Sequence, residues 1–428
     1  MKVRNRRVRS VLADLATSGY NPTSKLDDSG AHGVPIDLAA LSQQITRLGQ
    51  LALSRRPREE ARLARALAAL RQHAEGYESL AERVSRQGRL RPARPLEPLD
   101  LRGRLPPVPS AYTVIATDGS QIEPDRHGPV LCHLVNVGSA LLRYGPTPWA
   151  SLTSHPMLGF EEEDVYLAVG NREPVLVQDR LLALKRYIAE TALLADIAVT
   201  VDCGAPVIGL QDGTLLLSAW GQGGETYVWQ SLLRQFLGCL DRLRERGVLL
   251  ATYVSRPRSS DVVAALRLAT CPYREAACEE NCGSSRSGEI PCGELAGVLD
   301  RAVYEALPLA PGERSALLAS SWSTSVEHYG DHEIHFFYLN VGLELARVEV
   351  PKWVATDAAS LDLVHAVVYD QCARGQGYPR ALIEAHEKAV ITGADRRAYE
   401  ALIEQALVNC GLQPAPSEKQ RSKRLRSL

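Results

Sequence analysis

The sequence predicts an α/β fold in which a mixed sheet is flanked by helices and preceded by a helical region. Two observations carry this prediction. From residue 112 to residue 254, stretches rich in β-branched residues alternate with stretches of amphipathic helical spacing, a pattern typical of α/β domains. Before them, residues 36–87 combine leucines at helical spacing with abundant Arg, Glu and Gln, which favours helices.

Proline content and charge divide the chain into four parts. Residues 1–87 are expected to form an Arg-rich arm followed by a helical hairpin. Residues 88–110 are expected to form an extended linker, because their prolines exclude both helix and central strand. Residues 111–410 form the main domain, and residues 411–428 form a basic tail that we expect to be disordered.

The main domain is expected to begin with a β-hairpin, in which the strand that starts at residue 112 and ends at Asp118 pairs with residues 130–137 across a turn that contains Pro and Gly. Strands and helices then alternate. The expected strands are 207–212, 248–254 and a long extended stretch over 333–350; the expected helices are 177–195, 226–247, 358–373, one from about 379, and 395–409.

Composition excludes several classes of protein. The chain has 49 Lys and Arg against 50 Asp and Glu, so a basic field over the whole molecule is absent and any DNA contact needs a local basic groove. Nine cysteines in 428 residues are too few for a disulfide scaffold. The lack of a signal-peptide pattern and of a long apolar run predicts a soluble, cytoplasmic protein without a membrane segment. We find neither a P-loop nor a G-x-S-x-G elbow, which argues against an ATPase and a serine hydrolase.

Two strand-like stretches each lead into an Asp-Gly pair. Asp118 follows the stretch 112–117, and we expect this strand to end there because Gly119 allows a sharp turn. Asp212 and Gly213 follow the stretch 207–211 in the same way. Each pair alone is consistent with an ordinary turn. If both strands belong to one sheet, however, Asp118 and Asp212 can meet at its edge.

Further acidic and basic side chains complete a candidate site. Glu190 lies on the helix between the two strands, and His386 lies on a C-terminal helix. Carboxylates from two strands and one helix, with a late His, are the layout of a ribonuclease H-like metal nuclease. Hydrolysis of a phosphodiester uses divalent ions, and Mg²⁺ or Mn²⁺ takes oxygen ligands from Asp and Glu. Glu190 also has an alternative interpretation as the partner of Arg186 in an i,i+4 ion pair. Four other glutamates compete for its place: Glu161, Glu162, Glu163 and Glu173.

Several arginines are candidates for DNA phosphate contacts. Arg256 and Arg258 follow the strand 248–254, where they can bind phosphate or remain ordinary surface residues. A dimer that encloses DNA could line an inner channel with arginines and keep a balanced net charge. Further candidates for that channel are Arg242, Arg244 and Arg246.

Four cysteines lie within a short stretch. Cys271, Cys278, Cys282 and Cys292 are separated by six, three and nine residues, which is not the paired CxxC spacing of a zinc site. Four thiols this close can still ligate Zn²⁺ or an iron–sulfur cluster. The alternative is a loop with free thiols.

The sequence resembles the NurA family of DNA-repair nucleases over roughly residues 110–410. The resemblance is carried by five stretches in the family's order: ATDGSQ from Ala116, RYIAETA around Glu190, GLQDGTL from Gly209, YLNVGLELARVEVPKW from Tyr338, and YPRALIEAHEKA from Tyr378. The Cys-containing stretch and the N-terminal helical region are outside this set.

The resemblance implies a role for each matched residue. Asp118, Glu190 and Asp212 would bind metal, His386 would be a further ligand or handle a proton, and Tyr378 would lie near the substrate. It also implies a ribonuclease H-like fold and Mn²⁺-dependent cleavage of DNA. Such proteins act as single-strand endonucleases and 5′–3′ exonucleases, form homodimers, and work in DNA end resection and double-strand break repair with HerA, a hexameric ATPase translocase.

Two other classes of function stay open at the level of sequence. The same fold could serve as a catalytically inactive nucleic-acid-binding or scaffold protein. The chain could also be a metal sensor built on the four cysteines. Competent residue types at all five candidate positions favour the nuclease.

Overall fold

The computed structural model describes residues 37–85, 91–169, 172–201, 204–217, 225–273, 281–282, 290–307 and 309–412. By Cα packing the chain divides into two units, Met1–Pro57 and Arg58–Leu428. The described part of the first unit is the beginning of helix α2 (Leu38–Gln72). The predicted N-terminal arm and nearly all of the predicted basic tail lie outside the described residues.

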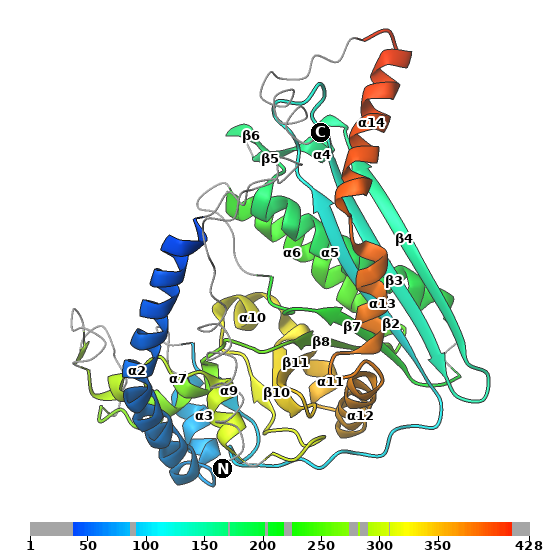
Figure 1. The fold of residues 1–428 in the computed structure, drawn as a ribbon. Helices are drawn as coiled ribbons and strands as arrows, with labels where there is room; N and C mark the ends of the chain where they lie inside the picture. Colours follow the sequence, from blue (N-terminus) through cyan, green and yellow to red (C-terminus); the bar gives the residue numbers. More distant parts are fainter. Residues whose placement is uncertain are drawn as a thin grey trace, which may run out of the picture. The chain divides into compact units, whose positions relative to one another are not determined.

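Within the described residues, nine strands form a sheet at the centre of the second unit, and this sheet is mixed, as the sequence predicts (Figure 1). Its order is β1-β9-β10-β11-β8-β7-β2-β3-β4. Strand β2 pairs in parallel with β7, and β7 with β8, whereas the other neighbours are antiparallel. The strands are β1 (Arg94–Pro95), β2 (Tyr112–Ile122), β3 (His133–Tyr144), β4 (Trp149–Gly159), β7 (Val207–Asp212), β8 (Leu249–Val254), β9 (Leu318–Ala319), β10 (Ile334–Asn340) and β11 (Leu345–Pro351).

Five of these strands form a ribonuclease H-like core. Strands β2, β3 and β4 make an antiparallel meander, and β7 and β8 extend it in parallel on the other side of β2. Helix α5 (Asp179–Thr200) precedes β7, and helix α6 (Glu225–Glu245) connects β7 to β8. A small hairpin of β5 (Tyr166–Val169) and β6 (Arg172–Leu176) follows the short helix α4 (Glu162–Val165).

Helices cover both faces of the sheet (Figure 1). On one face, α5 and α6 bury Leu194 and Phe236 in a core that includes Ile115 of β2. On the other face, α12 (Ala358–Arg374) and α13 (Arg380–Ala389) pack in a second core with the neighbouring Val114 and Ala116. Successive residues of β2 thus serve opposite cores, as the period of a strand requires. Full burial of an aliphatic side chain contributes about 1.5–3 kcal/mol, so these two cores fix the helices on the sheet.

A third core covers the other end of the sheet. There the second half of α2, α3 (Tyr77–Ser85), α7 (Asp261–Ala269) and α9 (Asp300–Ala306) bury apolar side chains against Phe336 and Tyr338 of β10. The expected N-terminal helical region is therefore present. The remaining elements of the described residues are α10 (Ser323–His328), α11 (Lys352–Ala355), α14 (Gly393–Asn409) and the 3-10 turns Pro291–Leu295 and Gly330–His332.

The predicted linker contributes to the sheet. Arg94 and Pro95 pair with Ala319 and Leu318 at the sheet's edge, where a proline is tolerated because its missing N–H is on the outer side. Glu97 accepts two hydrogen bonds from Arg314, at 2.7 and 3.0 Å. The proline-rich stretch is thus extended, as its composition predicts, and it packs on the domain that follows it.

Two expectations about strands were wrong. Strand β2 does not end at Asp118 but continues through Gly119 to Ile122, so Gly119 makes no turn. The extended stretch 333–350 is two antiparallel strands, because the chain reverses where Gly342 has a φ of +92° and Val341 N donates to Glu344 O at 3.0 Å. The hairpin of β2 and β3 is confirmed, although β3 begins at His133. Within the described residues, no helix has the length and apolar composition needed to cross a membrane.

Candidate active site

Asp118 and Asp212 lie next to each other on neighbouring strands. Strands β2 and β7 are parallel, and Thr117 pairs with Gln211, so the two aspartates are the next residues at the same level of the ladder. Strand β7 ends at Asp212, and Gly213 with a φ of +91° turns the chain away from the sheet. The sheet thus brings together the two carboxylates that the sequence singled out.

Helix α13 brings His386 to Asp118. The register places Gly138 of β3 opposite Asp118. A Cβ atom on Gly138 would lie 2.1 Å from the carbonyl oxygen of Ala385 and 2.4 Å from the backbone nitrogen of Ala389, so the backbone of α13 rests directly on this glycine. His386, the residue after Ala385 in α13, donates from Nδ1 to Asp118 Oδ2 at 2.6 Å. The histidine side chain is 63% exposed, and the aspartate side chain is 21% exposed, so the pair is open to a ligand.

Glu190 reaches the site from the opposite face of the sheet. Thr191 and Gln211, both fully buried, hydrogen-bond to each other at 3.0 Å and fasten α5 to β7 beside Asp212. A Cβ atom on Gly119 would lie 2.3 Å from Glu190 Oε1. Gly119 therefore provides the gap through which the Glu190 carboxylate approaches Asp118.

Burial and neighbouring charges raise the pKa values of two of the carboxyl groups. Burial raises the pKa of Glu190 to about 8; Arg186 opposes this rise, whereas Asp118 and Asp212 increase it. Partial desolvation also raises the pKa of Asp212, a hydrogen bond from Tyr378 lowers it, and the charge of Asp118 raises it further. The three carboxylates therefore interact electrostatically, and a nearby positive charge would favour their ionised forms.

Tyr378 completes the set of five predicted residues. Its hydroxyl donates to Asp212 Oδ1 at 2.8 Å, and its ring packs edge-on against Tyr253 with centroids 5.2 Å apart. Burial and the charge of Asp212 raise the pKa of this phenol, so it stays protonated as a hydrogen-bond donor. The structure thus brings all five predicted residues together beside the carboxyl end of strand β7, in the middle of the sheet.

The donor set fits a hard divalent cation. Glu190 is 4% exposed, and its Oε1 atom has no hydrogen-bond partner among the described residues, a costly arrangement unless an ion satisfies it. Carboxylate oxygens are the ligands that Mg²⁺ and Mn²⁺ prefer, and an imidazole suits Mn²⁺ as well. As they stand, no three His, Cys, Asp or Glu side chains of the described residues are close enough to hold an ion. Binding would have to draw the carboxylates closer.

The loop after Asp212 is held by a residue that the sequence interpretation missed. Glu349 of β11 accepts hydrogen bonds from Thr214 Oγ1 at 2.8 Å and from the amide of Leu215 at 2.9 Å. Its other oxygen accepts from Arg347 Nε at 2.8 Å, and Arg347 also pairs with Asp261 at 2.7 Å. The signal in the sequence is the alternation of charged and apolar residues in Arg347-Val348-Glu349, which places Arg347 and Glu349 on the same face of the strand.

The predicted phosphate-binding arginines separate into two groups. Arg256 and Arg258 are exposed in the loop after β8, and β8 is parallel to β7, so this loop leaves the same edge of the sheet as Asp212. By contrast, the arginines at and just after the end of α6 lie near the start of β8, at the other end of the strand. Arg242 forms an ion pair with Asp196, Arg244 forms one with Asp331, and Arg246 donates hydrogen bonds to the carbonyls of Val199 and Val201.

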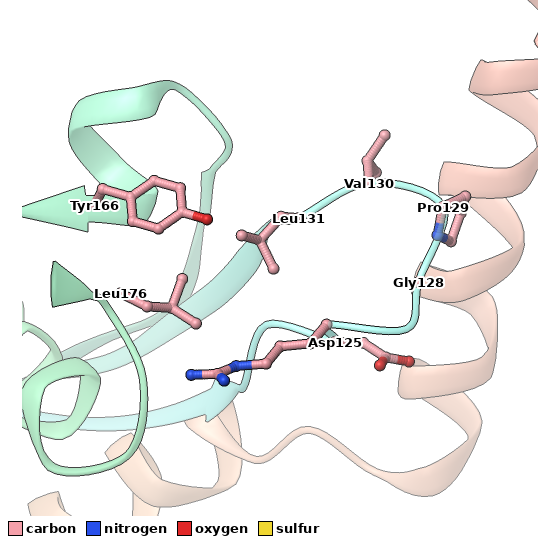
Figure 2. A pocket seen from close by; sticks show the side chains of 8 residues that line it. Asp125, Gly128, Pro129, Val130, Leu131, Tyr166 and Leu176 are labelled. Carbon is pink, nitrogen blue, oxygen red and sulfur yellow. The ribbon is translucent and has the colours of Figure 1, made fainter. Parts of the chain in front are cut away.

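The alternative glutamates lie elsewhere. Glu161, Glu162 and Glu163 are exposed at α4, and Glu173 is exposed in β6. A separate cavity of about 420 Å³ lies between the loop after β2 and the β5–β6 hairpin, and Leu131, Tyr166 and Leu176 are among the residues that line it (Figure 2). None of the five candidate residues lines this cavity.

The cysteine cluster gains no support as a metal site. Cys278 lies outside the described residues. Cys271, Cys282 and Cys292 are free thiols, and no group of three metal-binding side chains occurs in the described part of the chain. Cys292 instead accepts a long hydrogen bond from Arg267, at 3.7 Å. The described residues therefore do not support the prediction of Zn²⁺ or an iron–sulfur cluster.

Comparison with known proteins identifies the family. Comparison with curated proteins gives no significant match. Among solved structures, the chain is similar to a crystal structure of NurA with manganese, with 14% sequence identity, a TM-score of 0.33, and coverage of 71% of this chain and 91% of that one. The family model of the NurA domain matches residues 112–391, nearly two thirds of the chain. The chain therefore belongs to the NurA family of nucleases.

Proposed function

We propose that the protein is a divalent-metal-dependent DNA nuclease. The observation that carries this proposal is that Asp118, Glu190 and Asp212 come together from two strands and a helix, and that the buried Oε1 atom of Glu190 lacks a hydrogen-bond partner among the described residues. With His386 they would hold Mn²⁺, or Mg²⁺ in its place. Membership of the NurA family supports the same reaction.

A bound divalent ion would supply a lowered pKa for the attacking water and charge stabilisation at the scissile phosphate. The protein's own groups prepare the site for it. The hydrogen bond to Asp118 fixes the His386 ring and leaves Nε2 as its other polar atom, which can bind metal or exchange a proton with the DNA. Tyr378 orients Asp212 through its hydroxyl, and both side chains lie at the carboxyl end of strand β7.

DNA would approach from the side of the sheet where strands β7 and β8 end. Arg256 and Arg258 lie in the loop that follows β8 on this side of the sheet. Residues 255–260 of that loop include no acidic residue, so the two arginines are suited to phosphate contacts. Such contacts make affinity fall as salt rises. We further propose single-strand endonuclease and 5′–3′ exonuclease activity in DNA end resection and double-strand break repair. The enzyme would act as a homodimer with a HerA-type hexameric ATPase.

A cleavage assay tests the proposal. Labelled single-stranded and blunt duplex DNA would be incubated with Mn²⁺, Mg²⁺ or EDTA, with wild type beside Asp118→Ala and Asp212→Ala. We expect cleavage with Mn²⁺, none with EDTA, and none in either variant. Both variants should fold, because loss of a carboxylate relieves repulsion in the metal-free site.

The outcomes of this assay separate the competing functions. Full activity in Asp118→Ala would remove the site assignment. DNA binding without cleavage in any metal would favour an inactive scaffold or strict dependence on the ATPase. Adding a HerA-type ATPase would then distinguish these two, because only the second would gain activity.

A further inference from the structure

Arg186 belongs to the candidate site although no prediction from sequence placed it there. It lies on α5 one turn before Glu190. Its Nη1 atom donates to the carbonyl oxygen of Gly119 at 2.8 Å, the residue that follows Asp118 in β2. A Cβ atom on Gly119 would lie 2.9 Å from Arg186 Cγ, so the same missing side chain admits both the arginine and Glu190. The guanidinium is therefore fixed beside the carboxylates.

The contact between Arg186 and Glu190 is incomplete. Arg186 Nε lies 3.4 Å from Glu190 Oε1, but the two atoms do not form a hydrogen bond, and neither has another partner among the described residues. Leaving a buried donor or acceptor without a partner costs free energy, because the group has lost its hydrogen bonds to water. An ordinary helical ion pair would avoid this cost by closing the contact. The geometry instead leaves room for a cation at Oε1 and for an acceptor at the guanidinium.

The position of the guanidinium indicates which acceptor it would bind. The Arg186 side chain is 33% exposed, whereas that of Glu190 is 5% exposed, so the arginine extends from the buried carboxylate toward solvent. A guanidinium has five N–H donors and matches the oxygens of a phosphate in a two-pronged contact. Beside three carboxylates that repel DNA, it would supply attraction at the place where the phosphate must lie.

We propose that Arg186 binds a DNA phosphate at the cleavage site and balances the charge of Glu190 when no metal ion is bound. This inference rests on the proposed nuclease function, because it takes the phosphodiester as the ligand. It assigns Arg186 two partners in turn: Glu190 in the metal-free protein, and the phosphate once a cation takes over Glu190. A purely structural i,i+4 pair would have one partner throughout.

The test combines three variants and two binding measurements. Arg186→Gln removes the charge, Arg186→Lys keeps it without the two-pronged geometry, and Arg234→Gln removes an exposed arginine of α6 as a control. Affinity for a labelled single-stranded oligonucleotide is measured by fluorescence anisotropy over a series of salt concentrations, with Ca²⁺ present to occupy the carboxylates and with the oligonucleotide checked on a gel for cleavage. Affinity for Mn²⁺ alone is measured by calorimetry without DNA, and circular dichroism checks folding.

We expect Arg186→Gln to weaken oligonucleotide binding about tenfold or more, since hydrogen bonds to charged groups contribute about 1.5–3 kcal/mol. The slope of log affinity against log salt should fall by about 0.7, the value for one phosphate contact on single-stranded DNA. Arg186→Lys should weaken binding with the wild-type slope, and Arg234→Gln should change neither. Mn²⁺ should bind Arg186→Gln at least as tightly as wild type, because the guanidinium no longer competes for Glu190.

Unchanged DNA affinity and slope in Arg186→Gln would overturn the proposal. So would a joint loss of Mn²⁺ and DNA binding in a folded variant, which would indicate that Arg186 only supports the carboxylates. If Arg186→Gln does not fold, wild-type affinity in Arg186→Lys would overturn it instead. These readouts need no cleavage, so an inactive wild-type enzyme would refute the proposed nuclease function separately.

Discussion

Gly138 of β3 is the cross-strand partner of Asp118, and the backbone of α13 rests on it. This relationship explains how a helix from the C-terminal part of the chain reaches a strand near the start of the domain. Asn136 strengthens the contact, because its Nδ2 donates to the carbonyls of Lys388 and Ala389 at 3.1 and 2.9 Å. The position of His386 over Asp118 therefore depends on a residue that has no side chain.

Gly138→Ala should separate α13 from the sheet. The new Cβ would meet backbone atoms at 2.1 and 2.4 Å, which cannot move without shifting the helix. Overpacking of this kind costs about 1–3 kcal/mol, and His386 would move away from Asp118, so cleavage should fall with stability. Urea unfolding and the cleavage assay measure both effects.

A second glycine provides the control. Gly238 lies within α6, where an added Cβ would meet nothing within 4 Å. Gly238→Ala should therefore raise stability by about 0.5–1 kcal/mol and leave cleavage unchanged. Equal stability and activity in Gly138→Ala and wild type would show that α13 does not depend on this contact.

Glu349→Ala should be among the most destabilising single changes in the domain. Glu349 is 2% exposed and Arg347 is 6% exposed, so removal of the carboxylate leaves a buried arginine short of one partner and frees the loop after Asp212. Breaking a buried ion pair typically costs about 3–5 kcal/mol. Urea unfolding should show a loss of this size, and Mn²⁺ affinity should fall as well.

An exposed pair tests whether burial causes this effect. Arg301 and Glu305 form an i,i+4 pair at 3.6 Å in α9, and the Glu305 side chain is 52% exposed. Glu305→Ala should change stability by less than about 0.5 kcal/mol. Losses of similar size in the two variants would contradict the assignment of Glu349 as a buried anchor of the loop.

His365 should make stability fall as the solution becomes acidic. It is fully buried in α12 and hydrogen-bonds through Nε2 to the carbonyl of Gly312 at 2.8 Å, and burial lowers its pKa to about 4 from 6.5. Above pH 6.5 the group is neutral in both the folded and unfolded states. As the pH falls toward 4, the unfolded chain takes up a proton that the folded protein does not, so stability is lost over this interval.

The size of this effect can be measured with a substitution that does not titrate. Between pH 7.5 and pH 5, His365 should account for about 2 kcal/mol of lost stability. In His365→Gln the loss over this interval should be smaller by that amount, whereas the exposed His127→Gln should behave like wild type. The same pH dependence in His365→Gln and wild type would place the acid sensitivity elsewhere in the protein.

The sequence predicted the class of fold and its longer helices, because their patterns are local, but it did not predict β4 or the β5–β6 hairpin. Apolar stretches rich in β-branched residues placed β2, β7 and β8, and amphipathic spacing placed the helices between them, to within a few residues. The wrong interpretations involve glycine. Gly119 was expected to turn the chain, but it remains within β2 and admits Glu190, which only the packing of α5 can reveal. The reversal at Gly342 was missed because the flanking stretches are both strongly β-forming.

The five candidate side chains could be chosen from the sequence because their residue types match the chemistry and the family's motifs. Their supports could not be chosen. Gly138 and Glu349 are far in sequence from the groups that they position. Arg186 has the sequence pattern of an ordinary helical ion pair with Glu190. Such roles depend on which element packs on which, and local patterns in the sequence do not show that.

The central claim is that Asp118, Glu190 and Asp212 form one metal site, and calorimetric titration of the DNA-free protein with Mn²⁺ tests it most directly. Wild type should bind Mn²⁺, and Glu190→Gln should lose at least about tenfold in affinity, because the amide keeps the shape of the side chain but not its charge. Glu163→Gln, which changes an exposed glutamate of α4, should bind as wild type does. Unchanged Mn²⁺ affinity in Glu190→Gln, or no binding by wild type, would contradict the account.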